Sequence, residues 1–262
     1  MLEAVIAACK ETARREIMPR FMRVKLEHKN DKSVYTEADL AAQEALLGQL
    51  AAIENCPIIA EEMTENEQVE NWLAADGDVW CVDPIDGTSN FVNGLPYFAV
   101  SVALLRGGRP VLGVIVDPVS EEVFYAEKDR GAFLNGTPLP LKTRVPEGLS
   151  TAIAGIDFKR LSPALRARLA ADMPFSSQRN YGASVLEWCY AAAGRFDTYL
   201  HGGQKLWDYA AGSLILAEAG GHMCSFGHDD FWAAPLWKRP IIGALDAGVF
   251  EKWKTWLRAG AL

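Results

Sequence analysis

The chain has 262 residues, of which 50% are hydrophobic and 23% are charged, and its formal net charge is −8. This composition is ordinary for a globular protein, and the negative net charge gives no sign of the basic stripe that marks nucleic-acid-binding proteins. The longest apolar stretch, residues 95–105, contains Pro96 and is too short to span a bilayer, so we expect neither a nucleic-acid partner nor a membrane.

The cysteines and the first residues of the chain indicate the cellular compartment of the protein. Five cysteines are widely spaced and include no C-x-x-C pair, which argues against a disulfide framework and against a zinc site built from cysteine. Residues 1–21 lack the basic start and cleavage pattern of a signal peptide. We therefore expect a cytoplasmic protein.

Two amphipathic helices are predicted over residues 1–20 and 37–51, separated by a charged connector over 25–35. In the second helix Thr36 precedes Asp39 by three positions, which is the spacing of a capping box. The predicted apolar stripe of this helix is Leu40, Ala41, Leu47 and Leu50.

The next segments predict strands. The runs at 56–63 and 78–83 are apolar and end in acidic residues, as buried strands do where they reach solvent. Residues 97–129 are broken at Gly107-Gly108 and at Asp117-Pro118, which indicates a β-meander, and an Asn-Gly turn follows at 135–136.

After residue 145 the pattern changes to alternating elements. We predict a strand near 151–156 and helices over 183–193, 208–219 and 247–258. The predicted fold class is α/β: an α+β lobe with an antiparallel sheet over residues 1–145, and an α/β lobe over 146–262, together forming one compact unit.

Acidic residues follow several of these elements: Glu61 and Glu62, then Asp83 and Asp86, then Asp208. Asp83 and Asp86 are three positions apart, so we expect the chain to turn between them at Pro84, which would aim the Ile85 carbonyl inward. Two carboxylates and a carbonyl that converge would repel each other without a cation, and such oxygen ligands select Mg²⁺ before Mn²⁺ or Ca²⁺.

The same spacing separates this motif from D-x-D-G-T, the signature of phosphatases that form an aspartyl-phosphate, so a covalent mechanism is not favoured. The N–H groups of Gly87 and Thr88 form an anion site if a helix or turn begins there. Some of the acidic residues also have a purely structural interpretation. Glu61 and Glu62 can be the solvated end of a strand, and Asp208 can be a helix cap.

Taken together, "DPIDGTSNF" at 83–91, "WDYAAGSLILAEAGG" at 207–221 and "AEE" at 60–62 resemble the inositol monophosphatase family of Mg²⁺-dependent, lithium-sensitive phosphatases. The likeness runs in order over nearly the whole chain. It implies a layered αβαβα sandwich of the sugar-phosphatase type and a homodimer.

The resemblance also implies roles for particular residues. Glu61, Asp83 and the Ile85 carbonyl would hold one Mg²⁺, and Asp83, Asp86 and Asp208 a second, with Asp39 near an additional, weaker metal position. Glu61 and Thr88 would activate a metal-bound water for in-line attack on phosphorus, with Asp83 also counted in the catalytic set, and the N–H groups of Gly87 and Thr88 would bind phosphate.

The residues around the leaving group differ from the family pattern. Several inositol monophosphatases have an acidic residue seven positions before the helix-opening aspartate, where this chain has His201, which can donate instead of accept. Arg179 and Ser184 lie in a segment that resembles the loop contacting the leaving group, and Asp86 also belongs to the substrate-binding set. The alternative for Arg179 is a surface salt bridge.

The predicted function is a Mg²⁺-dependent phosphomonoesterase that hydrolyses small polyol or sugar phosphates by direct attack of a metal-activated water. On the same fold, the alternatives are a 3′(2′),5′-bisphosphate nucleotidase, a histidinol-phosphate phosphatase and a fructose-1,6-bisphosphatase. A regulator that keeps the fold and binds a partner protein is the alternative from another class. The presence of all five expected side chains, Glu61, Asp83, Asp86, Thr88 and Asp208, speaks against a degenerate site.

Overall fold

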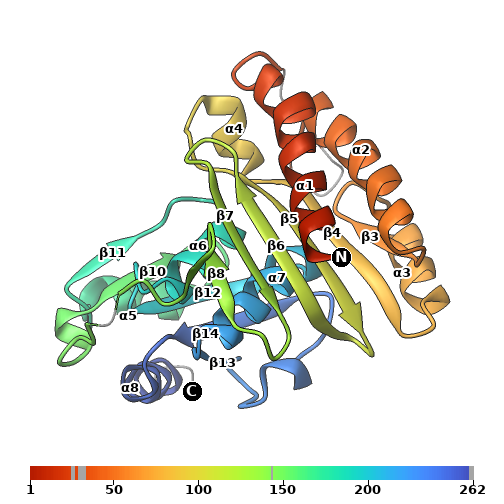
Figure 1. Cartoon of the computed structure of the whole chain (residues 1–262). Helices are drawn as coiled ribbons and strands as arrows, with labels where there is room; N and C mark the ends of the chain where they lie inside the picture. Colours follow the sequence, from red (N-terminus) through yellow and green to blue (C-terminus); the bar gives the residue numbers. More distant parts are fainter. Residues whose placement is uncertain (25–26, 29–33, 143, 260–262) are drawn as a thin grey trace.

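Two β-sheets alternate with layers of helices, so that the chain forms an αβαβα sandwich (Figure 1). The computed structural model describes residues 1–24, 27–28, 34–142 and 144–259. A seven-stranded sheet has the order β3-β4-β5-β6-β7-β8-β9, and a five-stranded sheet has the order β11-β10-β12-β14-β13. The predicted α/β fold class and its layering are confirmed.

The first sheet is the predicted meander with one strand added at its edge. Its strands are β3 (Ile58–Ala60), β4 (Asp78–Asp86), β5 (Ala99–Arg106), β6 (Arg109–Asp117), β7 (Glu122–Glu127), β8 (Ala132–Leu134) and β9 (Thr137–Pro138). All neighbours are antiparallel except β3 and β4. Asn135 and Gly136, both with positive φ, form the predicted two-residue turn between β8 and β9.

Both faces of the central strands β4 to β6 are covered, which is why these strands are largely apolar. In β4, Val79 and Cys81 pack into the layer shared with the central helices, whereas Trp80 and Val82 pack against the two N-terminal helices. Alternate residues of a strand point to opposite faces, so a strand buried on both sides reads as a continuous apolar run.

The N-terminal helix differs from its prediction over residues 1–20. Helix α1 (Leu2–Thr12) is followed by a π-helical turn (Ala13–Ile17) and a 3₁₀ turn (Met18–Arg20). Pro19 has no N–H to donate and clashes with the preceding turn of an α-helix, so a regular helix cannot run to residue 20.

Helix α2 (Glu37–Ile53) begins at the predicted capping box: Thr36 Oγ1 accepts from the Ala38 N–H, and Asp39 Oδ2 accepts from the Thr36 N–H. The predicted stripe was partly wrong, because Leu40 is exposed and the buried apolar face consists of Ala38, Ala42, Leu46 and Leu50. In the predicted connector, β1 (Glu27–His28) pairs with β2 (Val34–Tyr35), and residues 25–26 and 29–33 lie outside the described part.

The described residues of the second half form the other sheet and four α-helices. These are β10 (Ile153–Asp157), α5 (Pro163–Ala171), β11 (Ser177–Arg179), α6 (Ser184–Ala192), β12 (Thr198–Gln204), α7 (Leu206–Glu218), β13 (His222–Cys224), β14 (Arg239–Ala244) and α8 (Ala247–Arg258). Three predicted helices are confirmed within two residues. Helix α7 begins at Leu206, so Asp208 lies inside its first turn and is not the cap that the sequence suggested.

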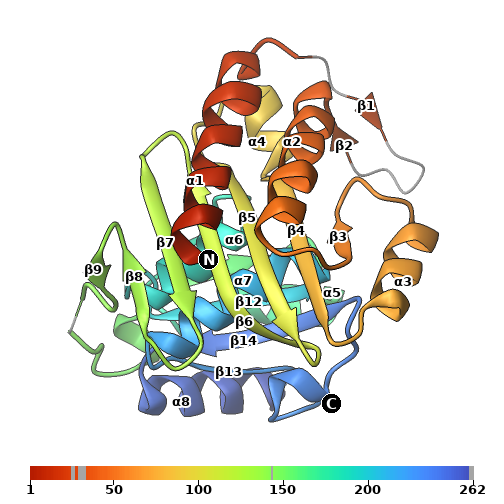
Figure 2. The ribbon, with the colours of Figure 1, turned by 45° about the vertical axis from the view of Figure 1, so that its right-hand side comes forward.

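Helices α6 and α7 lie between the two sheets, and α8 covers the outer face of the second sheet (Figure 2). The small residues at the start of α7 permit this packing. A side chain at Gly212 would overlap the Cβ atom of Trp188 on α6, and one at Gly113 on β6 would press on Ala211. The start of α7 therefore lies in close contact with both α6 and β6.

Some elements were not predicted. Helices α3 (Glu65–Ala74) and α5 carry few buried apolar residues, so their periodicity is weak. Local caps were nevertheless present: Thr64 with Glu67 before α3, and Ser162 with Pro163 before α5. Helix α4 (Thr88–Asn93) follows the Asp83–Asp86 motif, and 3₁₀ turns span Leu149–Thr151 and Phe231–Ala233.

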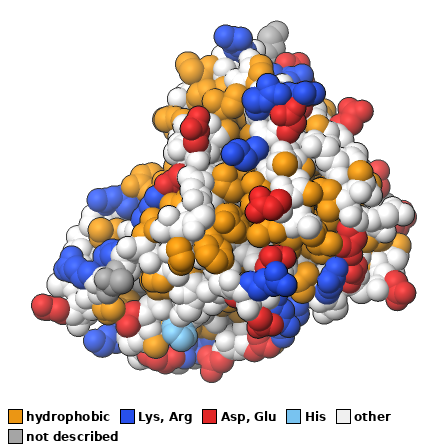
Figure 3. Space-filling model, in the orientation of Figure 1, with side chains coloured by type: hydrophobic (Ala, Val, Ile, Leu, Met, Phe, Trp, Pro, Cys, Tyr) orange, Lys and Arg blue, Asp and Glu red, His pale blue; other side chains and the backbone are white. Residues whose placement is uncertain are grey.

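On the face shown in Figure 3, Lys and Arg side chains are interspersed with Asp and Glu, and hydrophobic side chains gather over the middle of the molecule. This face carries no uniformly basic stripe. Among the residues described, no helix is both long and apolar enough to cross a membrane.

Candidate active site

A cleft of about 1060 Å³ opens where the end of β4 meets the starts of α6 and α7. It is lined from the first half of the chain by Glu61, Asp86 and Thr88, among others, and from the second half by Ser184 and Asp208. Residues more than a hundred positions apart thus share one cavity.

A β-bulge, and not the predicted turn, brings Asp83 and Asp86 together. Asp83 pairs with Ser101 of β5 and Asp86 with Ala99, so three steps on β4 oppose two steps on β5. Pro84 lies in this bulge, where the regular hydrogen bonding between the strands is already interrupted. Its missing N–H therefore removes no hydrogen bond of the regular sheet. In a regular strand, residues three apart point to opposite faces, and the extra residue turns both carboxylates to the same side.

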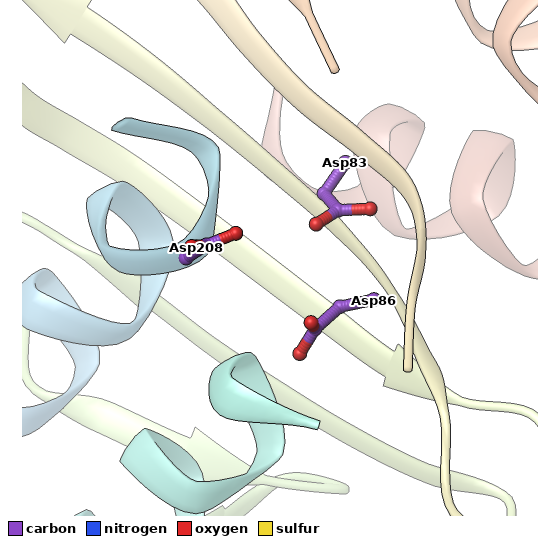
Figure 4. Close-up of side chains that lie close together, drawn as sticks. All are labelled: Asp83, Asp86 and Asp208. Carbon is purple, nitrogen blue, oxygen red and sulfur yellow. The ribbon is translucent and has the colours of Figure 1, made fainter. Parts of the chain in front are cut away.

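Asp208 of α7 completes a group of three carboxylates (Figure 4). One oxygen from each of Asp83, Asp86 and Asp208 lies within 4.8 Å of the others. Two of the three are held by backbone donors: Asp86 Oδ2 accepts from the Val185 N–H at 2.7 Å, and Asp208 Oδ2 accepts from the Lys205 N–H at 2.8 Å.

The surroundings of Asp83 point to a cation. Asp83 is 1% exposed, and within the described part neither oxygen has a hydrogen-bond donor apart from a proton that it can share with Glu61. Burial raises its pKa well above the usual range, and the charges of Glu61, Asp86 and Asp208 raise it further. A buried carboxylate with no donor is costly, and a hard divalent cation would satisfy all three groups at once.

Burial likewise raises the pKa values of Asp86 and Asp208. For Asp86 the charge of Asp208 is the next cause. The residues present therefore fit Mg²⁺, because they are oxygen donors only and their mutual repulsion requires positive charge.

Thr88 links this group to helix α2. Its hydroxyl oxygen lies 3.0 Å from the Ile85 carbonyl oxygen and 3.2 Å from Asp39 Oδ1. The other oxygen of Asp39 accepts from the N–H and hydroxyl of Thr36. Asp39 is fully buried and lies outside the group of three, so its place at an additional metal position stays a prediction.

Gly87 occupies a position that requires glycine. Its φ is +94°, and a Cβ atom there would lie 3.1 Å from the Tyr97 carbonyl oxygen and 3.1 Å from the Ala183 Cβ. The residue permits the chain to pass from the bulge of β4 directly into α4 while packing against the start of α6.

Three of the four predicted substrate contacts, Asp86, Ser184 and His201, line the cleft, and Arg179 does not. The Arg179 Nη1 donates to Ser177 Oγ at 2.6 Å and to the Gln178 carbonyl at 2.9 Å. The structure therefore gives Arg179 no contact with the cleft, nor with any carboxylate of the described residues.

Several residues in the cleft were not predicted: Asp157, Lys159, Arg160, Glu187 and Lys205. Asp157 had a usable signal, because it ends the apolar run of β10 as Glu61 and Asp83 end theirs. The others had none, since they reach the cleft only through the packing of α6, β12 and the segment after β10.

Comparisons with known proteins agree with the geometry. The model of the inositol monophosphatase family matches residues 1–257. Nus factor SuhB of Pasteurella multocida is 38% identical over 209 residues, which cover 76% of this chain and 75% of that protein. Inositol-1-monophosphatase of Rhizobium meliloti is 35% identical over 178 residues, covering 63% of this chain and 66% of that protein.

Among solved structures, an IMPase of Thermotoga maritima is similar over 98% of this chain and 97% of its own, with a TM-score of 0.82 and 27% sequence identity. The similarity in three dimensions therefore extends over both halves of the chain.

Proposed function

The chain belongs to the inositol monophosphatase family, whose members are metal-dependent phosphatases, and we propose that it hydrolyses the phosphate monoester of a small polyol or sugar. The observation that carries the proposal is the buried group of Asp83, Asp86 and Asp208 at a cleft large enough for a small phosphorylated metabolite.

We assign the metal ligands as follows. Asp83, Asp86 and Asp208 would hold one Mg²⁺, while Glu61, Asp83 and the Ile85 carbonyl would hold another, and Mn²⁺ is the alternative ion. A third ion would lie near Asp39. When bound, Mg²⁺ supplies positive charge for the phosphoryl oxygens and makes a coordinated water more acidic.

The chain's own residues would orient the attacking water. The Thr88 hydroxyl has one proton, and both acceptors near it, the Ile85 carbonyl and Asp39 Oδ1, belong to the protein. Its lone pairs are then left to accept from a water in the cleft. Glu61, which lines the same cleft, would take the proton that the water loses as its oxygen attacks phosphorus.

In an in-line attack the phosphorus atom would lie between this water and the leaving group. The N–H groups of Gly87 and Thr88 would bind phosphate oxygens, and Asp86, Ser184 and His201 border the space for the leaving group. The same arrangement is open to a 3′(2′),5′-bisphosphate nucleotidase, a histidinol-phosphate phosphatase or a fructose-1,6-bisphosphatase, which differ in the leaving group.

Phosphate release from inositol, sugar, nucleotide and histidinol phosphates, with Mg²⁺ and with EDTA, tests the proposal. We expect Mg²⁺-dependent turnover of at least one polyol or sugar phosphate, and inhibition by millimolar Li⁺. The absence of turnover on every substrate would refute the phosphatase assignment for this chain.

A second function is favoured by one observation, the 38% identity to a relative named as a Nus factor. We propose that this chain has such a regulatory role in addition to catalysis. The Asp83→Asn variant separates the two roles when it replaces the native protein in cells whose growth is impaired by deletion of the gene. Normal growth of the variant strain assigns the essential role to binding. Growth as poor as that of the deletion strain assigns it to catalysis.

We further propose, from the family resemblance, a cytoplasmic homodimer. All five cysteines are free, as expected in a reducing compartment. Light scattering coupled to size-exclusion chromatography tests the dimer, and a mass of one chain would contradict it.

A further inference from the structure

One wall of the cleft carries a carboxylate that the proposed reaction does not use. Asp157 is the last residue of β10, and it is the register partner of His201 on the neighbouring parallel strand β12. Both residues line the cleft, and the Asp157 side chain is 18% exposed. Asp157 therefore reaches the space where a leaving group would lie.

His201 uses both of its ring nitrogens within the protein. Nδ1 accepts from the Gly203 N–H at 3.1 Å, so the proton of the neutral ring resides on Nε2, which lies 3.3 Å from Asp157 Oδ2. This corrects the expectation that His201 itself donates to the substrate. The only ring N–H is already directed at Asp157.

A bulge in β12 supports this arrangement. His201 pairs with Ile241 of β14 and Gln204 pairs with Arg239, so one residue is extra between them. Bulges of this kind redirect backbone groups and side chains. Here the bulge contains Gly203, whose N–H holds the imidazole in place.

Asp157 is fixed from its other side as well. Oδ1 accepts from the Lys159 N–H at 2.6 Å. Burial by itself would raise the pKa of Asp157, but the hydrogen bond from His201 and the Lys159 N–H together lower it. The carboxylate is thus charged at neutral pH, and two donors leave part of its acceptor capacity unused.

The segment after Asp157 is pressed against β12. A Cβ atom at Gly202 would overlap the backbone carbonyl of Arg160, so only glycine permits this contact. Asp157, His201 and the backbone of 159–160 consequently form one packed wall of the cleft.

We propose that Asp157 recognises a hydroxyl group on the leaving group of the substrate and that His201 is its positioning residue. A fixed carboxylate with free lone pairs selects a hydrogen-bond donor. The small polyol or sugar of the proposed function carries hydroxyl groups beside its phosphate, so the donor is a hydroxyl. Lys159 and Arg160, which line the same cleft, partly offset the charge of its acidic residues. The proposal rests on the proposed phosphatase function and names the feature of the substrate that this chain selects.

The test compares two substrates, a polyol monophosphate such as inositol 1-phosphate and p-nitrophenyl phosphate, whose leaving group offers no hydroxyl to Asp157. For Asp157→Asn we expect kcat/KM on the polyol phosphate to fall about 10- to 100-fold, as for loss of a hydrogen bond to a charged group. The loss should appear mainly as an increase in KM, and turnover of p-nitrophenyl phosphate should change by less than about twofold. The control is Asp172→Asn, which changes an exposed carboxylate after α5. Its activities on both substrates should also change by less than about twofold.

His201 is tested by a conservative pair. His201→Gln retains an N–H that can donate toward Asp157, and His201→Leu does not. The positioning role predicts that the Leu variant shows the KM increase on the polyol phosphate and that the Gln variant recovers most of it. Equal losses in both variants and on both substrates would overturn that role.

The outcomes separate this inference from the proposed function. If the wild type turns over both substrates and Asp157→Asn loses the same factor of activity on both, Asp157 does not recognise the leaving group. The proposed phosphatase function would stand in that case. A selective loss on an amino-alcohol phosphate, in place of the polyol phosphate, refutes the hydroxyl assignment. Wild-type inactivity on every phosphate ester refutes the function itself.

Discussion

At the scale of single residues, the Asp83 carboxyl has the least favourable surroundings in the site. It is buried against three other acidic groups. Among the described residues, its only hydrogen bond is through a proton that it can share with Glu61. Folding gains nothing from such a group in the absence of a cation, because a buried charge without a partner is destabilising. The proposed metal site accounts for its position.

Asp83→Asn should therefore reduce Mg²⁺-dependent turnover by about 10²- to 10³-fold or more, the scale found when one group that stabilises transition-state charge is removed. The metal-free variant should unfold at the same temperature as the wild type or higher, because one charge leaves a repelling group. Activity and thermal unfolding in EDTA check both points, with Glu65→Gln, an exposed acid on the cleft rim, as the matched control. Wild-type turnover in Asp83→Asn would overturn the metal assignment.

Glu187 is a second buried acid, and it links stability to pH. Burial raises its pKa from 4.5 to about 7, although the Tyr181 N–H donates to Oε1 at 3.0 Å and partly offsets the shift. Because the folded state holds the proton more tightly than the unfolded state, the free energy of unfolding must fall as pH rises from about 4.5 to about 7. The contribution of this group is about 3 kcal/mol at 1.4 kcal/mol per pKa unit.

Glu187→Gln should remove that dependence. We expect the variant to match the wild type near pH 5 and to be more stable by about 3 kcal/mol at pH 8, since the amide oxygen can still accept from Tyr181. Urea denaturation at pH 5, 6, 7 and 8 measures the difference. Parallel stability curves for the two proteins would show that Glu187 does not titrate in this range.

At the scale of elements, the site depends on where strands and helices end. The bulge of β4 turns Asp83 and Asp86 to one side, and the first turns of α6 and α7 meet it there. The Asp86 carboxylate accepts from the Val185 N–H of α6, so a shift of that helix would move a proposed metal ligand. Under the proposed mechanism, the crossing of α6 and α7 would therefore affect catalysis as well as packing.

Gly212→Ala tests this crossing. An added methyl group would overlap Trp188, and overpacking of this kind costs about 2–3 kcal/mol. Gly48→Ala is the control, because Gly48 lies within helix α2 with no atom within 4 Å of the added Cβ, and it should stabilise the protein by about 0.5–1 kcal/mol. Thermal and urea unfolding of both variants provide the comparison; equal effects would contradict a tight α6–α7 contact.

At the scale of the whole molecule, the two halves of the chain share a core. The buried cluster around α6 and α7 includes Ile59 and Phe124 of the first sheet and Tyr199 and Ile241 of the second. Each sheet has one face in this cluster, and separation of the sheets would expose both faces to water. We therefore propose that the two predicted lobes, 1–145 and 146–262, form one unfolding unit.

Calorimetry should accordingly show a single transition in EDTA, and Mg²⁺ should raise its midpoint without splitting it. Saturation of the proposed site at a hundred times the dissociation constant would add about 2.7 kcal/mol. Trp188→Ala, a change in the shared layer, should lower the whole transition. Two separate transitions in the wild type would contradict the single unit.

Local sequence determined much of the fold. The capping box of Thr36 and Asp39, the Asn135-Gly136 turn and the apolar runs of β4 to β7 depend on neighbouring residues and solvent exposure alone, and they were predicted. Helix α3 and the C-terminal end of α1 were not predicted. Helix α3 has weak apolar periodicity, and the prediction over residues 1–20 ran through Pro19, which ends a regular helix.

The motifs of the site were also visible in the sequence, since their residue types and spacing suit metal and phosphate. The sequence by itself thus determined the family and the residues able to bind a cation. Only the tertiary structure decided that a bulge, and not a turn, aligns Asp83 with Asp86, that Arg179 stays outside the cleft, and that His201 donates to Asp157. These depend on strand register and on contacts between segments distant in the chain, which local patterns do not encode.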